Sequence, residues 1–249
     1  LVTNLNCRDG RPVDGGHPSI EPGNYAIERL GAATGAWVAY CTDDVRALAP
    51  EQLAGFDAIC LNNTCGVLTD DPRLRAGLLQ FVADGGGLIG FHAAAATFCQ
   101  YPDYDQFPEF GQMLGGYENG GHPWGPEDTI VLSPVDLDSP INAAFGGQDF
   151  EIQDEVFQMR EHYDRSRLRV LLAINTDRTD MSETRYILPE RRADRDLAIS
   201  WVRRHGAGRV FYSSLGHNPH IFWNAPVLAH FLAGIQYALG DLEADDSPI

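Results

Sequence analysis

Lysine is absent from this sequence of 249 residues, and its absence excludes several classes of protein. A phosphate-binding Walker loop, a Schiff-base enzyme and a pyridoxal-phosphate enzyme all depend on a lysine amine. Basic charge is scarce as well, because 18 arginines accompany 35 acidic residues and the net charge is −17. Such a chain lacks the basic face that neutralises nucleic-acid phosphates. We therefore expect a small-molecule partner and no nucleic acid.

Long apolar runs are also lacking, since glycine, proline or charge interrupts each one. None approaches the ~20 residues that a membrane-spanning helix needs, so we expect no membrane partner. No signal peptide is recognisable in residues 1–20, although a chain with a cleaved leader would look the same. The five cysteines are dispersed and form no C-x-x-C pair, which argues against a disulfide framework and a zinc finger. These features favour a cytoplasmic protein and leave its oligomeric state open.

Strand and helix patterns alternate along the chain. A helix is predicted from the N-cap Asp71 and Pro72 to the glycines at 85–87, and another ends at Gly240, before an acidic tail at 241–249 that we expect to be frayed. Apolar runs with the length of strands lie at 1–5, 37–41, 58–61, 88–91, 129–132, 170–174, 197–202 and 210–213. The pattern predicts a single α/β domain over 1–249, flavodoxin-like, with a mainly parallel sheet flanked by helices. Ligands of such sheets bind beyond the carboxyl ends of the strands.

One apolar strand ends at His92, which four alanines follow. The pattern is typical of a nucleophile elbow, where a sharp turn after a strand exposes one side chain and small neighbours let the backbones approach. An imidazole there suits a general base or a metal ligand, since it is a poor nucleophile for lasting acyl transfer. The alternative is a histidine that only caps the strand. We favour the functional interpretation because α/β sheets bind ligands at this end of their strands.

His217 follows the strand predicted at 210–213 in a similar way. If the two strands are neighbours in one parallel sheet, His92 and His217 converge at the same edge. A turn histidine bonded to the backbone explains the spacing of His217 equally well.

Several motifs, in this order and spacing, resemble the ThuA-like (trehalose-utilisation) family, whose fold is similar to that of class I glutamine amidotransferases. The resemblance covers nearly the whole chain and rests on His17-Pro18-Ser19-Ile20, 62–66, 85–94, Thr97-Phe98, Gly115-Gly116-Tyr117, His122-Pro123, Asp154-Glu155, 208–217 and Gly234-Ile235. It implies that His92 occupies the place of the amidotransferase cysteine nucleophile and that His217 lies near the place of its catalytic histidine. We therefore expect no glutamine amidotransferase activity.

The same motifs supply the other candidate site residues. We expect catalytic roles for His92, His217, Glu155 and Asp154, and substrate-binding roles for His17, His122, Trp124, Tyr117 and Asn63. Because neighbouring residues of a strand point to opposite sides, only one carboxylate of the Asp154-Glu155 pair should reach the pocket. The other is left for solvent or for a backbone cap. Aromatic rings that stack on sugars, beside amides and carboxylates that bond hydroxyls, are consistent with a carbohydrate pocket.

A divalent metal such as zinc is one interpretation of the histidines. His17, His92, His122 and His217 together with a carboxylate offer ligands of the kind that zinc prefers. No local spacing such as H-E-x-x-H supports the site, so the fold would have to bring the ligands together. A metal-free histidine and carboxylate pair explains the same residues.

The resemblance implies an enzyme of sugar metabolism, a hydrolase, lyase or isomerase that acts on trehalose-type disaccharides or 3-keto-glycosides. A compatible mechanism begins with proton abstraction next to a sugar ketone by His92 or Glu155. His217, His122 or a metal would polarise the carbonyl. The alternative is a non-catalytic carbohydrate-binding or regulatory module, because a fold alone does not imply activity.

Overall fold

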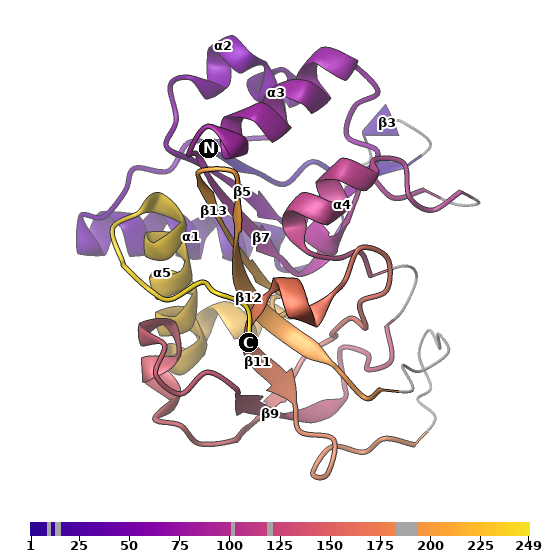
Figure 1. Ribbon diagram of the computed structural model, residues 1–249, viewed down its shortest axis with the longest axis vertical. Helices are drawn as coiled ribbons and strands as arrows, with labels where there is room; N and C mark the ends of the chain where they lie inside the picture. The colour runs from indigo at the N-terminus through magenta and orange to yellow at the C-terminus, as the bar shows by residue number, and fades with distance from the viewer. Residues whose placement is uncertain (9–10, 13–15, 101–102, 119–121, 183–193) are drawn as a thin grey trace.

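The computed structural model describes residues 1–8, 11–12, 16–100, 103–118, 122–182 and 194–249 (Figure 1). The α-helices in these ranges are α1 Ile20–Thr34, α2 Pro50–Leu53, α3 Pro72–Ala83, α4 Pro108–Leu114 and α5 Ala225–Leu239. The 3₁₀ helices are η1 Val45–Leu48, η2 His92–Ala95, η3 Pro140–Phe145, η4 Arg165–Arg167 and η5 Pro219–Trp223. In the part of the chain so described, no helix has the length and apolar character needed to cross a membrane.

Nine strands form one mixed sheet with the order β10-β9-β11-β12-β13-β7-β5-β1-β4. These strands are β1 Val2–Thr3, β4 Cys41–Thr42, β5 Ala58–Asn62, β7 Gly87–Phe91, β9 Thr129–Pro134, β10 Phe150–Gln153, β11 Arg169–Ile174, β12 Ala198–His205 and β13 Gly208–Ser213. Two short pairs lie outside it, β2 Cys7–Arg8 with β3 Arg11–Pro12 and β6 Cys65–Gly66 with β8 Ala96–Thr97. Pairing is parallel from β13 through β7, β5 and β1 to β4, and antiparallel from β10 to β13. The α/β prediction is confirmed, with a parallel core extended by an antiparallel half.

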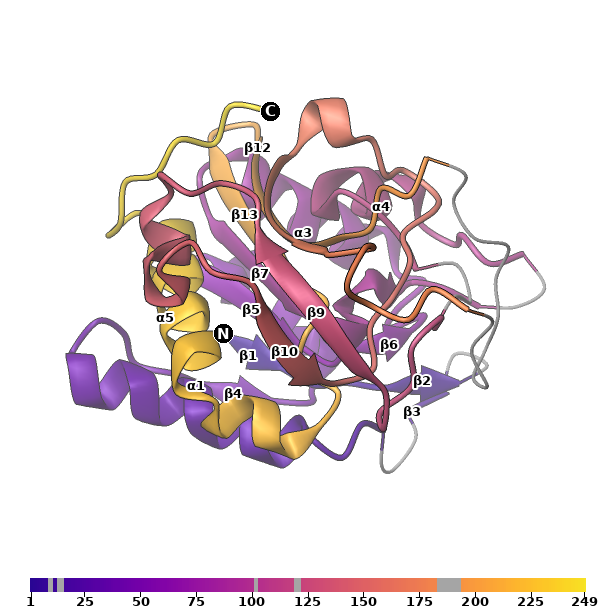
Figure 2. The same ribbon diagram turned by 90° about the horizontal axis from the view of Figure 1, so that it is seen from below.

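Helices cover both faces of this sheet, as the view in Figure 2 shows. One apolar core includes Ile27 of α1 and Phe231 of α5, and it also takes in residues of β9 and β11. The other core includes Leu78 of α3 and Met113 of α4, with Leu53 of α2 beside them. Both central strands, β5 and β7, are buried along their whole length. The uninterrupted apolar runs of these strands follow from cover on two sides.

The predicted helix boundaries are confirmed where capping residues define them. The Asp71 side chain accepts a hydrogen bond from the backbone N–H of Arg73 at the start of α3, and Pro72 is the first helical residue. Gly240 ends α5 in the left-handed region, with φ of 88°.

The strand predicted at 37–41 was wrong over most of its length. Only Cys41 and Thr42 pair, with β1 at the sheet edge, and Val38 is 98% exposed. Trp37 instead packs toward α1, where its indole N–H donates to the carbonyl of Ile27. The apolar residues here therefore reflect packing against a helix and surface exposure, and not a buried strand.

The acidic tail from Asp241, which we expected to be frayed, has no regular structure but lies against the strands. Asp245 pairs with Arg169 of β11 at 2.7 Å and Asp246 pairs with Arg204 of β12 at 2.5 Å. The Tyr237 hydroxyl also donates to Asp246. These contacts hold the tail against the sheet.

Candidate functional site

Three neighbouring strands end in register at one edge of the sheet. Asn62, Phe91 and Ser213 are partners across β5, β7 and β13. The residues that follow them therefore leave the sheet side by side, and His92 is one of these. The predicted convergence depended on β7 and β13 being parallel neighbours, and they are.

His92 lies at a sharp bend between β7 and η2. Its φ is 45°, a left-handed conformation that few non-glycine residues adopt, and its side chain is fully buried. The backbones are close here, because a Cβ at Gly90 would lie 3.1 Å from the Cβ of Ala94. The bend therefore has the elbow geometry that the sequence predicted.

The proton position on His92 follows from its backbone contact. Nδ1 lies 2.9 Å from the carbonyl oxygen of Ser214, and because a carbonyl only accepts, Nδ1–H is the donor. In the neutral ring, Nε2 then carries a lone pair. The imidazole stacks on Phe157, with ring centroids 4.3 Å apart, which fixes the direction of Nε2.

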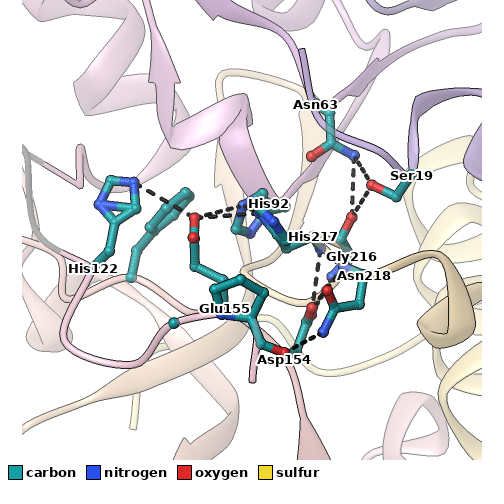
Figure 3. Close-up of polar contacts among 12 residues, drawn as sticks. Ser19, Asn63, His92, His122, Asp154, Glu155, Gly216, His217 and Asn218 are labelled. Carbon is teal, nitrogen blue, oxygen red and sulfur yellow. Dashed lines mark hydrogen bonds and ion pairs between the residues drawn. The ribbon is translucent and has the colours of Figure 1, made fainter. Parts of the chain in front are cut away.

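Four side chains converge on one point beyond the strand ends, and Figure 3 shows three of them, His92, His217 and Glu155. His17, His92, His217 and Glu155 each place one ligand atom within 4.8 Å of the other three. His92 Nε2 lies 3.2 Å from His217 Nδ1 and 3.4 Å from Glu155 Oε1, and the latter two atoms are 3.3 Å apart. We call these four residues the His/Glu cluster. It joins the loop before α1, the ends of β7 and β13, and the segment after β10.

Asp154 holds the loop that carries His217. Its carboxylate accepts the backbone N–H groups of Gly216 at 2.7 Å, His217 at 3.4 Å and Asn218 at 2.7 Å. The side chain is fully buried, and burial raises the pKa of Asp154 although the neighbouring His92 and the N–H groups of Gly216 and Asn218 oppose the shift. Asp154 thus lies behind the loop and Glu155 lies in the cluster.

The other side of the same loop is held through the carbonyl of Gly216. The Ser19 hydroxyl donates to this oxygen at 2.5 Å and the Asn63 amide donates to it at 3.3 Å. Asn63 itself has φ of 58° and is fully buried. Through its contact with Gly216 its amide group supports the loop that carries His217.

Burial keeps two of the histidines neutral near pH 7. It lowers the pKa of His17 to about 2, assisted by the neighbouring His92 and His217, and it lowers the pKa of His122 to about 4. Burial alone would raise the pKa of Glu155, but the neighbouring His217 and His92 outweigh it and hold this pKa below its usual range. The site therefore offers neutral imidazoles beside an ionised carboxylate.

A family model described as "ThuA: Trehalose utilisation" matches residues 12–238. The chain belongs to the ThuA family. The comparison with curated proteins gave no match.

Solved structures of similar fold include two described as ThuA-like proteins. The Bacteroides uniformis protein has a TM-score of 0.72 at 19% identity, with 95% of this chain and 90% of that one covered. The Parabacteroides merdae protein has a TM-score of 0.67 at 15% identity, with 96% and 88% covered. A cytoplasmic protein of Salmonella typhimurium LT2 has a TM-score of 0.57 at 11% identity, with 95% and 97% covered. At these identities the likeness concerns the fold.

The structure of this ThuA family member separates the predicted site residues into groups. His17, His92, His217 and Glu155 come together. His122 lies beside them, its Nε2 3.6 Å from Glu155 Oε1. The group that could hold a metal therefore has three of the four predicted histidines, with Glu155 as the carboxylate and without His122. Of the acidic pair only Glu155 lies in the cluster and Asp154 caps the backbone, but both residues follow the end of β10 at Gln153, so the alternation of strand side chains is not the cause.

Tyr117 and Trp124 lie in the core, so their expected contacts with substrate are corrected to packing roles. Tyr117 is fully buried and its hydroxyl donates to the carbonyl of Phe107 at 2.7 Å. Trp124 is 2% exposed and its indole N–H donates to the carbonyl of Asp180. In both cases the polar atom that a sugar would need is directed to the backbone.

Sequence reasoning missed three residues that shape the site. Phe157 stacks on His92, the Ser214 carbonyl orients it, and Glu118 is a buried carboxylate whose Oε2 lies 3.6 Å from His122 Nδ1. The signals were present but weak, because Phe157 and Ser214 look like core and turn residues. Glu118 lies four residues before His122, a spacing without meaning outside a helix.

Acid should destabilise the folded protein through its buried histidines. Burial lowers the pKa of His230 to about 4, as it does for His122, whereas unfolded histidine titrates near ~6.5. The unfolded chain therefore binds more protons between these values, and the stability present above pH ~6.5 is lost as pH falls toward about 4. Chemical denaturation across this range should show a falling free energy of unfolding. A constant value would contradict the neutral, buried state of these rings.

Proposed function

We propose that this protein is a cytoplasmic enzyme of sugar metabolism that acts on trehalose-type disaccharides or their 3-keto derivatives, using a divalent cation held by the His/Glu cluster. The convergence of His17, His92, His217 and Glu155 within 4.8 Å carries the proposal. Membership of a family described by trehalose utilisation supports the substrate class. The acidic charge and the free cysteines favour a small-molecule partner and a reducing compartment.

The donor set fits a cation such as zinc. His92 Nε2 and Glu155 Oε1, two acceptors, face one another at 3.4 Å, which is unfavourable unless a proton or a cation lies between them. His17 Nδ1 and Glu155 Oε2 are buried without a hydrogen-bond partner among the described residues. Ligands of a tetrahedral zinc lie ~3.4 Å from each other, given bonds of ~2.1 Å. The separations of 3.2–3.4 Å among His92, His217 and Glu155 match this spacing, and the ligand atom of His17 lies within 4.8 Å of them.

The surrounding residues supply the support that metal-binding histidines need. The Ser214 carbonyl holds the proton of His92 on Nδ1 and so leaves Nε2 for the cation. Asp154 fixes the backbone of His217 from outside the cluster. When bound, the cation would act as a Lewis acid toward a carbonyl or hydroxyl oxygen of the sugar.

The remaining chemistry falls to side chains outside the four ligands. If His92 and Glu155 hold the cation, neither is free to take a proton, whereas His122 lies beside Glu155 and is 18% exposed. His122 Nε2 is then the atom placed to accept a proton next to a sugar ketone. Loss of the glycosidic group and isomerisation both begin with such a proton transfer, whereas hydrolysis needs a group that takes a proton from water or gives one to the departing oxygen.

Elemental analysis of protein purified without chelator or a nickel column tests the cation. We expect a stoichiometric divalent metal that a chelator removes. Absence of stoichiometric metal would contradict this part of the proposal and leave a metal-free histidine and carboxylate pair.

A panel of disaccharides and their 3-keto derivatives, followed by mass spectrometry, tests the substrate class. We expect turnover of at least one trehalose-type compound, lost with the metal and restored by zinc. Protein that retains its metal but converts no member of the panel would reject the substrate class and favour a binding module. The His220→Ala variant is the control, because His220 is exposed and lies outside the cluster.

A further inference from the structure

Ser19 lies at the N-cap of α1, but its hydroxyl bonds to a distant loop instead of to the helix. A serine at an N-cap ordinarily accepts a hydrogen bond from an N–H group of the first helical turn. Among the described residues the Ser19 side chain accepts no such bond; it is fully buried and donates to the carbonyl of Gly216 at 2.5 Å. Ser139, the N-cap of η3, shows the ordinary arrangement and accepts from the N–H of Ile141. Ser19 therefore gives up its local role for a contact 197 residues away in the sequence.

The partners of Ser19 fix the direction of its hydrogen bonds. A carbonyl only accepts, so the single proton of the hydroxyl points to Gly216, and the Ser19 oxygen accepts from the amide of Asn63 at 3.3 Å. Figure 3 shows Ser19 and Asn63 on one side of Gly216 and Asp154 on the other. The carbonyl of Gly216 is thus held from one side, while Asp154 holds its N–H from the other.

This hydroxyl joins the two loops that carry His17 and His217. His17 lies two residues before Ser19, and its carbonyl accepts from the N–H of Ile20 at 3.2 Å, which ties His17 to the first residue of α1. His217 directly follows Gly216. The two imidazoles meet edge to face, with centroids 5.1 Å apart. The loops therefore touch at the imidazoles and again at the Ser19 hydroxyl.

We propose that Ser19 is a positioning residue that couples His17 to His217. It fixes the Gly216 carbonyl relative to the start of α1 and thereby holds the two imidazoles at the separation that a shared cation needs. Without the hydroxyl, each loop keeps its own backbone contacts but loses the bond that joins it to the other. The consequence for metal binding rests on the proposed function, whereas the coupling of the two loops does not.

Hydrogen exchange in metal-free protein tests the coupling. The Ser19→Ala variant removes the hydroxyl but no capping bond, so it should fold. We expect amide exchange to become about tenfold faster in both loops, at Gly216 on one side and at Ile20 and Gly23 on the other, relative to the amides of β5 and β7 that report global unfolding. Ser139→Ala, which removes an N-cap bond, is the matched control and should leave both loops unchanged relative to the same strands. Faster exchange in one loop alone, or in neither, would overturn the coupling.

The affinity for a metal probe tests the consequence for the His/Glu cluster. With Co²⁺ in place of zinc, Ser19→Ala should bind about 10- to 100-fold more weakly, because contacts that orient metal ligands contribute on this scale. Its cobalt absorption bands should also change, whereas Ser139→Ala should keep the wild-type affinity and spectrum. Wild-type affinity together with an unchanged spectrum in Ser19→Ala would overturn the role of Ser19 in the cluster. If the wild-type chain binds neither zinc nor cobalt, the cation of the proposed function is rejected, and the exchange measurement alone decides whether Ser19 couples the loops.

Discussion

The His92→Ala variant is expected to lose turnover by at least ~10³-fold while it remains folded. His92 is the residue that joins every part of the cluster, since its Nε2 contacts both His217 and Glu155. Because the His92 imidazole is one of the proposed ligands of the cation, its removal should also abolish stoichiometric metal binding. The free energy of unfolding should fall by about 2 kcal/mol, because the buried Ser214 carbonyl loses its donor.

A second variant distinguishes backbone effects from chemistry at this position. Alanine is disfavoured at φ of 45°, whereas asparagine tolerates the left-handed region. His92→Asn should therefore unfold at a higher temperature than His92→Ala and yet be equally inactive. We would measure turnover, metal content and thermal unfolding on both variants, with His220→Ala as the control. These measurements separate the effect of the backbone from that of the imidazole. Wild-type turnover in either variant would remove His92 from the site.

Elements with their own local signals could be predicted from the sequence. The Asp71-Pro72 start of α3 is defined by capping groups, and the buried runs of β5 and β7 follow from cover on both faces. The run at 37–41 has the same composition without that cover. It failed as a strand because only its last residue, Cys41, and the following Thr42 pair with β1 at the sheet edge. Apolar composition alone does not distinguish a strand from residues packed on a helix.

The candidate site also contains residues whose place could be predicted from the sequence and residues whose place could not. His92 and His217 could be predicted because each follows a strand and the two strands are neighbours. Glu155 enters from the far edge of the sheet, along an irregular segment that returns to the carboxyl ends, where the Phe157 N–H donates to the Ser214 hydroxyl. No periodicity specifies that path. The prediction that only one acidic residue of the pair would reach the pocket assumed a strand, whereas both residues lie beyond the end of β10.

Asp154 supports the cluster without belonging to it, and its removal is expected to cause a large loss of folding stability. In the Asp154→Ala variant three backbone N–H groups lose their acceptor, that of Gly216, which is buried, and those of His217 and Asn218, which are partly buried. Each unsatisfied buried donor costs ~1–3 kcal/mol, so the free energy of unfolding should fall by about 3 kcal/mol or more. The Glu151→Ala variant, at an exposed position of β10, should change it little.

The metal affinity of a second variant, Asp154→Asn, tests whether Asp154 supports metal binding or takes part in catalysis. Asp154 touches none of the four ligand atoms directly, and it acts on His217 through the backbone of its loop, so Asp154→Asn should retain the fold and bind metal about 10- to 100-fold more weakly. A catalytic role for Asp154 predicts the opposite pattern, with metal affinity unchanged and turnover lost. Competition with a chromogenic chelator measures the first quantity, and single-turnover kinetics on metal-saturated protein measures the second. Because asparagine keeps one acceptor for the loop, saturating metal should restore most of the turnover if Asp154 acts by holding His217.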